Sequence, residues 1–315
     1  MRSVIVLLLL VGLFTRCFAQ DHFVTANHIK IAYQTFGSLG SPTLILINGT
    51  ASPLTDYPEN FCSQIADRGY FVIRFDNRDV GHSSHLDSLG QPDWKAIIPL
   101  IKTCDKAPLP YTLQDMGMDL IGLMDALKIK KAHLAGASMG GAIAQLIAIE
   151  HPSRVLTLAS ISASSGNPDR IPSDPKVFAI MSAPPPKTNS EDSLSAYLVK
   201  INLALGSRDS KEDLKKDAME SIKRGWYPEG SARHAAAVII GDYCDRRERL
   251  SRLKIPVIVI QGDADPLVKP EAGLEVAKAV PGAQTTIIKG MGHHLSKMFI
   301  SQISEAIVAN ASKVK

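Results

Sequence analysis

One serine lies in a sequence context that can make it a nucleophile. Ser138 is the centre of a Gly-x-Ser-x-Gly pattern at residues 136–140. The apolar run 132–135 predicts a short strand before the pattern, and residues 139–150 predict a helix that ends before Pro152. A serine on such a strand-to-helix turn has a strained backbone and an exposed hydroxyl, and the free N–H groups of the helix N-terminus can face a developing negative charge. We therefore interpret Ser138 as a nucleophile; a tight turn without chemistry is the alternative interpretation.

A base and an acid occur at matching places downstream of this serine. Serine needs a base to remove its proton, and the base needs an acid to orient it. Asp265 follows the apolar run 257–260, and His293 follows the run 285–288. Each of these residues therefore comes directly after a predicted strand. The chain order serine, aspartate, histidine predicts a set of side chains that cleaves an acyl bond.

A second carboxylate and a second imidazole lie close to Asp265 and His293 in the sequence. Asp263 precedes Asp265 by two positions, and we interpret it as a turn residue that caps local backbone. His294 is adjacent to His293, so we expect its side chain to point elsewhere. No Asp or Glu occurs in residues 160–166, so the end of the preceding strand offers no alternative acid.

Strand and helix patterns alternate along the chain and predict the elements that position these residues. Runs that are apolar on both faces, bounded by helices, favour an α/β fold with a mostly parallel sheet covered on both sides. The expected strands are residues 29–36, 43–47, 70–75, 132–135, 155–160, 257–260 and 285–288, and the expected helices include 58–69, 139–150 and a closing helix within 300–308.

One long interval breaks this alternation. Residues 166–253 contain no strong strand pattern, and three helical stretches are expected near 191–204, 211–224 and 232–250. We interpret the interval as a helical lid inserted between two strands of the sheet. Residues 20–165 and 254–315 are then the two parts of the core domain.

The turns that carry the acid and the base resemble those of the α/β-hydrolase superfamily. Members of that family place the acid in a Gly-x-x-Asp turn after the seventh strand and the histidine in a Gly-x-Gly-His-like turn after the eighth. Residues 262–265 and 290–293 have these two patterns. The resemblance extends from about Phe23 to the C-terminus. It implies an eight-stranded sheet with the lid between strands six and seven, Asp265 as the acid and His293 as the base.

An acyl-transfer site also needs donors for the oxyanion of the tetrahedral intermediate. The residue after the nucleophile, Met139, supplies one backbone N–H. The resemblance places the second donor in the turn after the strand 43–47, which corresponds to the backbone N–H of Thr50. Family members usually have His-Gly there, whereas this chain has Asn48 before Gly49. This difference puts the local hydrogen bonding in doubt but leaves the main-chain donor in place.

A third turn resembles the family but has a structural interpretation. Residues 76–83 are similar to its Asp-x-Arg-Gly-x-Gly-x-Ser turn, with Asp79 in place of the first glycine. We expect Arg78 to pair with a nearby carboxylate. His82 and His85 are expected on the loop surface, and no His-x-x-x-His pair occurs among the nine histidines, which disfavours a zinc hydrolase.

The first nineteen residues have the pattern of a secretory signal. Arg2 provides the positive charge, residues 4–14 are an apolar run too short to span a bilayer, and small residues near Ala19 predict cleavage after it. An uncleaved anchor, or a lipoprotein signal at Cys17, are the alternatives. The expected location is therefore secreted or periplasmic, without a stable membrane span after cleavage.

Cysteine count and charge limit the remaining properties. Cleavage would leave Cys62, Cys104 and Cys244, which allow at most one internal disulfide. Cys62 has helical spacing with apolar neighbours and is expected to be buried, so Cys104 and Cys244 are the pair to test. The formal charge of +4 comes from 35 basic and 31 acidic residues without a dominant basic run, which argues against nucleic acid as a partner.

These observations predict a secreted serine hydrolase that acts through an acyl-enzyme. The expected substrate is a small-molecule ester or amide, and no cofactor or metal is implied. Within the family, the chain looks most like carboxylesterases of the aclacinomycin methylesterase type. An aminopeptidase of the proline iminopeptidase type is one alternative, and a binding protein that keeps the fold without the chemistry is another. The sequence leaves the oligomeric state open.

Overall fold

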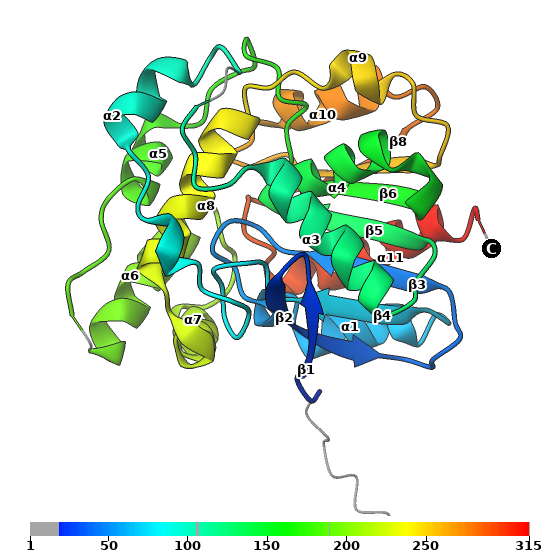
Figure 1. The fold of residues 1–315 in the computed structure, drawn as a ribbon, viewed down its shortest axis with the longest axis horizontal. Helices are drawn as coiled ribbons and strands as arrows, with labels where there is room; N and C mark the ends of the chain where they lie inside the picture. The colour runs from blue at the N-terminus through cyan, green and yellow to red at the C-terminus, as the bar shows by residue number, and fades with distance from the viewer. Residues whose placement is uncertain (1–18, 105–106, 189, 315) are drawn as a thin grey trace, which may run out of the picture.

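A computed structural model describes residues 19–104, 107–188 and 190–314 of the chain. The predicted signal, residues 1–19, lies outside the described residues except for Ala19. Eight strands form one sheet within the described part, in the order β1-β2-β4-β3-β5-β6-β7-β8 (Figure 1). β1 pairs with β2 and β2 with β4 in antiparallel fashion, and all other neighbours are parallel. The strands are β1 (His22–Ala26), β2 (Ile29–Phe36), β3 (Thr43–Ile47), β4 (Phe71–Phe75), β5 (Ala132–Ala137), β6 (Val155–Ile161), β7 (Val257–Gly262) and β8 (Gln284–Ile288).

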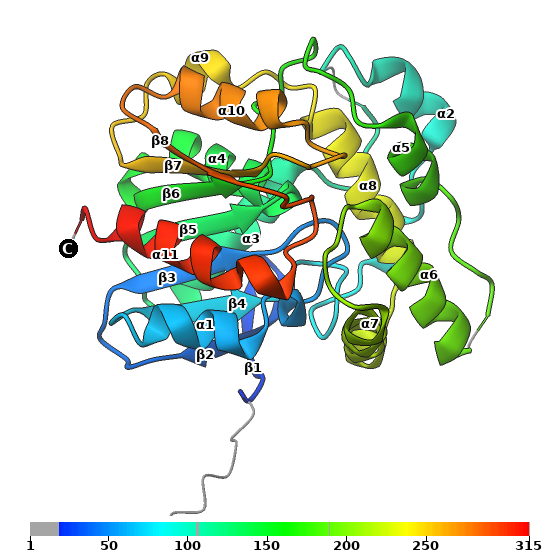
Figure 2. The same ribbon diagram turned by 180° about the vertical axis from the view of Figure 1, so that it is seen from behind.

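Helices cover both faces of this sheet, as the apolar runs predicted. On one face, α1 (Glu59–Ala66) and α11 (Ile300–Ala311) pack on the strands, and on the other face lie α3 (Leu113–Ala126), α4 (Met139–Glu150) and α10 (Pro270–Ala279) (Figures 1 and 2). β5 and β7 are buried along almost their whole length because they have helices on both sides. The predicted α/β class with a mostly parallel sheet is confirmed.

The carboxyl ends of the parallel strands lie along one edge of the sheet. Ile47 at the end of β3 is paired with Gly136 of β5, and Gly262 at the end of β7 is paired with Ile288 of β8. Residues that directly follow these strands are therefore brought to the same edge, although they are far apart along the chain. This edge is where ligands bind in open α/β sheets.

Five helices lie between β6 and β7 in chain order, within the described residues. They are α5 (Pro175–Met181), α6 (Glu191–Ala204), α7 (Lys211–Gly225), α8 (Pro228–Gly241) and α9 (Arg247–Leu250). We call residues 166–253 the helical insertion. Figures 1 and 2 show its helices α5, α6, α7 and α8 grouped beside the sheet rather than on either of its faces. The remaining short elements are α2 (Trp94–Ile97) and the 3₁₀ helices η1 (Leu54–Asp56), η2 (Asp87–Leu89), η3 (Ile98–Leu100), η4 (Pro152–Arg154) and η5 (Lys297–Phe299).

The expected helices of the insertion need two corrections. The expectation of a single helix over 232–250 is wrong, because α8 begins earlier, with Pro228 in its first turn, and the chain leaves the helix after Gly241. The backbone N–H of Arg246 then donates to the carbonyl oxygen of Ser165 (2.9 Å), which turns the chain back toward the sheet before α9. The second correction is α5, a helix that was not predicted and that the side chain of Asp174 caps.

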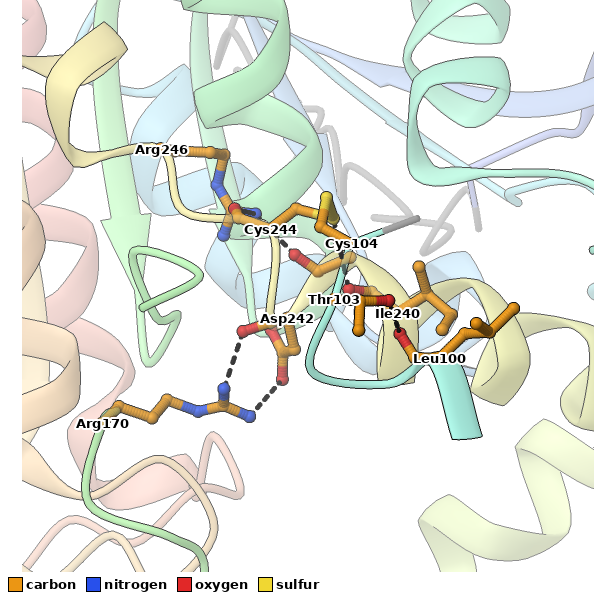
Figure 3. The surroundings of a disulfide bond; sticks show 9 residues. Leu100, Thr103, Cys104, Arg170, Ile240, Asp242, Cys244 and Arg246 are labelled. Carbon is orange, nitrogen blue, oxygen red and sulfur yellow. Dashed lines mark hydrogen bonds and ion pairs between the residues drawn. A yellow bond between two sulfur atoms is a disulfide. The ribbon is translucent and has the colours of Figure 1, made fainter. Parts of the chain in front are cut away.

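A disulfide joins the insertion to the core. Cys104, in the segment after η3, is bonded to Cys244, in the turn after α8, with 5.0 Å between their Cα atoms (Figure 3). Cys62 is free and buried in α1. The suggested pairing of Cys104 with Cys244 is therefore confirmed.

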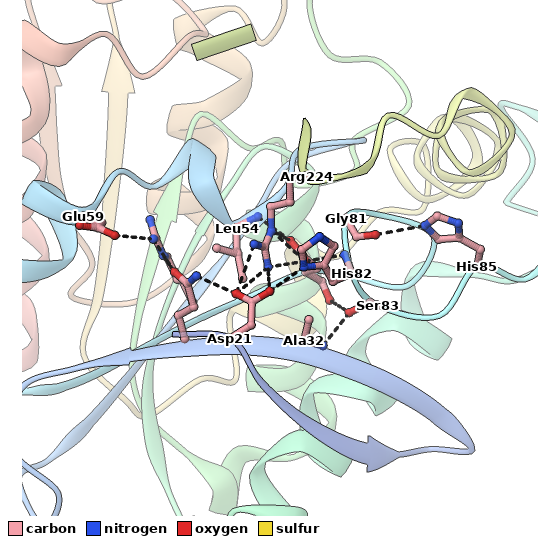
Figure 4. A network of polar contacts seen from close by, with 12 residues as sticks. Asp21, Ala32, Leu54, Glu59, Gly81, His82, Ser83, His85 and Arg224 are labelled. Carbon is pink, nitrogen blue, oxygen red and sulfur yellow. Dashed lines mark hydrogen bonds and ion pairs between the residues drawn. The ribbon is translucent and has the colours of Figure 1, made fainter. Parts of the chain in front are cut away.

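Buried ion pairs make further connections between the insertion and the core. Arg224, at the end of α7, contacts the carboxylates of Asp76 (2.8 Å) and Asp21 (3.2 Å), which belong to the end of β4 and the segment before β1 (Figure 4). Arg233 of α8 contacts Asp79 (2.7 Å), and both side chains are fully buried. A buried charge is costly unless it is paired, so these contacts hold the insertion in one place.

No helix within the described ranges is both long enough and apolar enough to pass through a membrane.

The disulfide makes a testable contribution to stability. Replacing both cysteines (Cys104→Ser with Cys244→Ser) is expected to lower the free energy of unfolding by about 2–4 kcal/mol, because the unfolded chain gains freedom when the cross-link is lost. The crosslink spans a sequence separation of 140 residues. Urea denaturation measures the change. A reductant should destabilise the parent protein and leave the double variant unaffected; equal stability of the two proteins without reductant would contradict the expectation.

Candidate active site

The backbone at Ser138 has an unusual conformation that presents its side chain. Ser138 lies between β5 and α4 with φ 54° and ψ −120°, a left-handed region that non-glycine residues seldom adopt. Its N–H donates to the carbonyl oxygen of Ile161 at the end of β6 (2.9 Å), and its hydroxyl does not cap the helix. The side chain is half-buried. The hydroxyl is thus held on a sharp turn at the carboxyl edge of the sheet, as the pattern predicted.

Two glycines of the pattern permit the close packing around this turn. A Cβ atom on Gly136 would overlap the carbonyl oxygen of Gly140, and one on Gly140 would overlap the carbonyl oxygen of Ile47 in β3. The first turn of α4 therefore packs directly against the backbone of β5 and β3. A larger residue at either position would push α4 away and move Ser138 with it.

Asp265 and His293, the predicted acid and base, lie next to each other at this edge. Nδ1 of His293 is 2.9 Å from Oδ2 of Asp265, and the two side chains are 7% and 0% exposed. The N–H groups of Leu267 and Val268 donate to the other oxygen of Asp265, at 2.9 Å each. These bonds fix the carboxylate, and the carboxylate fixes the orientation of the imidazole.

The two groups shift each other's pKa. Burial alone would raise the pKa of Asp265, but the positive charge of His293, its hydrogen bond and the backbone N–H donors lower the pKa below its usual value. Burial alone would lower the pKa of His293, but the charge of Asp265 and the hydrogen bond raise it. Asp265 is therefore ionised, and His293 becomes a stronger base.

Nε2 of His293 is the ring nitrogen that is left to accept a proton, because Nδ1 faces Asp265. No hydrogen bond joins Ser138 Oγ to His293 among those of the described residues. Catalytic hydrogen bonds are often long before substrate binds. The structure thus pairs His293 with Asp265 directly and places Ser138 at the same sheet edge, after β5.

Two backbone N–H groups lie beside Ser138 and can receive an oxyanion. Met139 is the first residue of α4, and Thr50 follows Gly49 in the turn after β3. A Cβ atom on Gly49 would lie 3.5 Å from Cβ of Ser138, so this turn is in contact with the serine. Within the described residues, neither the N–H of Met139 nor that of Thr50 has a hydrogen-bond acceptor. Both donors are available for a ligand.

The asparagine in this turn has a clear structural role. Nδ2 of Asn48 donates to the carbonyl oxygen of Pro53 (3.0 Å), which closes the turn across Gly49 and Thr50. The carbonyl oxygen of Asn48 accepts a bond from Nδ2 of Asn77 (3.3 Å). The hydrogen bonding that the sequence left in doubt is therefore supplied by the asparagine itself and by the turn after β4.

The neighbouring aspartate and histidine have other partners. Oδ1 of Asp263 accepts a bond from the N–H of Gly290 (2.6 Å), so Asp263 caps the turn before His293. Nδ1 of His294 lies 3.4 Å from Oγ of Ser296, and burial, with the charges of His293 and Lys297, lowers its pKa to about 4. Both side chains are thus directed to contacts outside the pair of Asp265 and His293.

Arg78 and Asp79 have the structural role that was expected of their turn. Arg78 forms two bonds with the carboxylate of Asp119 in α3, at 2.6 and 2.7 Å, which confirms the predicted pairing. Asp79 accepts from Arg233 of the insertion and from the hydroxyl of Tyr111 (2.8 Å).

Two residues of the insertion that were not among the predicted site residues contact the candidate site. The carbonyl oxygen of Leu205, after α6, accepts a bond from the N–H of His293 (2.7 Å). Nδ1 of His234, in α8, accepts a bond from the N–H of Ala51 (3.1 Å), next to Thr50. Neither had a signal in the sequence, because one acts through its backbone and the other is a single histidine within a helix.

Comparisons with known proteins agree on one fold. Residues 42–297 match the model of a family described as the alpha/beta hydrolase fold. The chain is 27% identical over 308 residues to rhodomycin D methylesterase DauP of Streptomyces sp. (strain C5), which covers 91% of this chain and 96% of that protein. It is 27% identical over 246 residues to 3-oxoadipate enol-lactonase 2 of Acinetobacter baylyi, covering 78% of this chain and 79% of the lactonase. The crystal structure of the enol-lactonase from Burkholderia xenovorans LB400 superposes on this structure with a TM-score of 0.69 and 21% sequence identity. The match covers 92% of this chain and 100% of that one, so the two proteins share the fold.

The raised pKa of His293 predicts a specific pH dependence. His293 can accept a proton only when it is neutral, so kcat/KM is expected to fall with decreasing pH through a pKa above the ordinary value of 6.5. Asp265→Asn removes the charge that raises this pKa, so the acid limb moves to lower pH, and kcat falls on the order of 10⁴-fold. If the activity of Asp265→Asn is too low to measure, an NMR titration of the His293 ring gives the change in its pKa directly.

Asp263→Asn is the matched control for this variant. It neutralises the neighbouring carboxylate while keeping an oxygen acceptor for the N–H of Gly290. We expect it to leave the acid limb in place. A His293 titration that is unchanged in Asp265→Asn would contradict the assigned pairing.

Proposed function

Because the chain belongs to the α/β-hydrolase fold family, we propose that it is a serine hydrolase that cleaves small-molecule carboxylic esters through an acyl-enzyme. The observation that carries this proposal is the geometry of the sheet edge. Ser138 stands on a strained turn beside two N–H groups that have no acceptor within the described residues, and the ion-paired Asp265 and His293 follow β7 and β8 at the same sheet edge.

The reaction has two steps, the acylation of Ser138 and the hydrolysis of the acyl-enzyme. Oγ of Ser138 attacks the ester carbonyl carbon while Nε2 of His293 takes the hydroxyl proton, and the ionised Asp265 stabilises the imidazolium that forms. The N–H groups of Met139 and Thr50 donate to the oxyanion of the tetrahedral intermediate. When the intermediate collapses, the bond to the alcohol breaks, and the alcohol leaves with the proton from His293.

Water completes the cycle. His293 takes a proton from a water molecule, whose oxygen attacks the acyl carbon of the ester formed with Ser138. The second tetrahedral intermediate releases the carboxylic acid, and Ser138 Oγ regains its proton from His293. No further group is consumed, because each proton taken by the imidazole is returned.

The relatives favour an ester over an amide as the substrate. One is named as a methylesterase and another as an enol-lactonase, so the bonds named for these proteins are an ester and a cyclic ester. This supports the carboxylesterase prediction over the aminopeptidase alternative. All positions that the chemistry needs are filled, which supports an enzyme over a binding protein with the same fold.

We further propose that the chain is exported and that residues 1–19 are removed as a signal. Two independent features support this. Arg2 followed by the apolar run 4–14 is typical of a signal segment. The disulfide between Cys104 and Cys244 is of the kind that persists in oxidising compartments such as the periplasm or the exterior of the cell.

We also assign to the insertion, residues 166–253, the role of a cover over the site.

A panel of synthetic substrates tests the reaction class. We expect p-nitrophenyl esters of short to medium acyl length to be hydrolysed much faster than aminoacyl anilides. Ser138→Ala should lower kcat for the esters by about 10³-fold or more, because the acyl-enzyme can no longer form.

Ser162→Ala is a matched control for the serine. Ser162 lies just after β6 at the same sheet edge, and its buried hydroxyl has no hydrogen-bond partner within the described residues. We expect this variant to keep the activity of the parent enzyme. Faster turnover of aminoacyl anilides than of esters would contradict the proposed substrate class, and full activity of Ser138→Ala would contradict the mechanism.

A further inference from the structure

The turn that carries the Thr50 donor is strained and is held from outside the core. Ala51 follows Thr50 with φ 56°, a left-handed conformation that costs a non-glycine residue energy. Strained backbone persists only where the surrounding structure imposes it. The side chain of Asn48 closes the turn on one side. The N–H of Ala51 is bound by the insertion.

His234 of α8 makes this contact with one ring nitrogen and anchors itself with the other. Its Nδ1 accepts the hydrogen bond from the N–H of Ala51 at 3.1 Å, and its Nε2 donates to the carbonyl oxygen of Arg78 at 2.7 Å. The side chain is completely buried. Because Nδ1 accepts and Nε2 donates, the ring must be neutral with its proton on Nε2.

The surroundings of His234 keep it in this state. Burial lowers its pKa to about 4; the bond to Arg78 and the charge of Asp79 oppose that shift, and the charges of Arg78 and Arg233 add to it. The imidazole is therefore neutral at any pH where His293 can act as a base. Nδ1 remains an acceptor for Ala51 throughout that range.

The neighbouring residue prevents α8 from moving. Arg233 forms two hydrogen bonds with Asp79, at 2.7 and 2.8 Å, and both side chains are fully buried. Removing one partner of such a pair leaves an uncompensated buried charge, so the pair resists separation. His234 is thus presented to the turn from a fixed position.

The contact has a direct consequence for the oxyanion donor. The peptide that carries the Ala51 N–H and the peptide that carries the Thr50 N–H share the Cα atom of Thr50. Fixing the first plane therefore limits rotation of the second. An oxyanion donor is effective only about 2.7–3.1 Å from the developing charge, so a small rotation of this peptide weakens the stabilisation.

We propose that His234 is a positioning residue that holds the Thr50 N–H in place for the oxyanion, so that the insertion completes the active site and is not merely a cover. The proposal rests on the proposed function. The bond from the N–H of His293 to the carbonyl oxygen of Leu205 (2.7 Å) extends the same idea to the base, because the insertion then holds the turns on both sides of the substrate carbonyl.

Variants of His234 test this role. His234→Leu removes both ring contacts, and we expect kcat for p-nitrophenyl esters to fall about 10–100-fold while KM changes less than about threefold, since the donor matters most in the transition state. His234→Gln offers an amide oxygen for Ala51 and an amide N–H for Arg78. We expect it to restore kcat to within about fivefold of the parent enzyme.

A trifluoromethyl ketone separates positioning from general destabilisation. Its adduct with Ser138 places an oxyanion in the site, so its affinity should weaken in His234→Leu in the same proportion as kcat/KM. Asn167→Ala is the control, because it removes another contact between the insertion and the core, the partly buried 2.9 Å bond to Glu275 in α10. This control should lower Tm without lowering kcat.

The outcomes distinguish the possible failures. Parent-like kcat and ketone affinity in His234→Leu, or an equal loss in His234→Gln, would overturn the positioning role. If His234→Leu does not fold, His234→Asn is measured instead, because its amide oxygen keeps an acceptor near the position of Nδ1. A loss of more than tenfold in the kcat of His234→Asn, with parent-like affinity for the ketone, would also overturn the positioning role. A parent enzyme that neither cleaves esters nor reacts with the ketone would refute the proposed function itself.

Discussion

The left-handed backbone at Ser138 is the constraint on which the rest of the site depends. A residue other than glycine adopts φ 54° only when its neighbours leave no alternative, and here β5, α4 and the end of β6 surround it. The first turn of α4 can pack against β3 only because Gly140 has no side chain. The turn after β3 also lies against Ser138, because a Cβ atom on Gly49 would be 3.5 Å from Cβ of the serine. The proposed nucleophile and the proposed oxyanion donors therefore depend on the same local packing.

The proposed base and acid lie at this place because parallel strands end at a common edge. His293 and Asp265 follow adjacent strands, so their separation along the chain has no bearing on their distance in space. The insertion enters from the side at the same edge, and its buried ion pair between Arg233 and Asp79 attaches it to the core. The candidate active site is thus bounded by turns of the sheet and by an insertion that buried contacts hold to the core.

The sequence predicted the parts of this structure that have local causes. Apolar runs located seven of the strands, and turn patterns after them indicated where polar side chains would gather. β1 was missed because it is a short edge strand with largely exposed residues, which leaves no apolar run. The break between α8 and α9 was missed because the contact that turns the chain there, from the N–H of Arg246 to the carbonyl oxygen of Ser165, joins residues far apart in sequence. His234 was missed for the same reason, since its partners Ala51 and Arg78 are far from it in sequence.

Peptide mapping after reaction with a fluorophosphonate probe shows whether Ser138 is the nucleophile that His293 activates. The probe forms a bond only with a serine that a neighbouring base activates. We expect a single phosphonylated peptide, the one that contains Ser138, and almost no labelling in His293→Ala. Labelling of a different serine, or equal labelling of Ser138 without the His293 imidazole, would contradict the account.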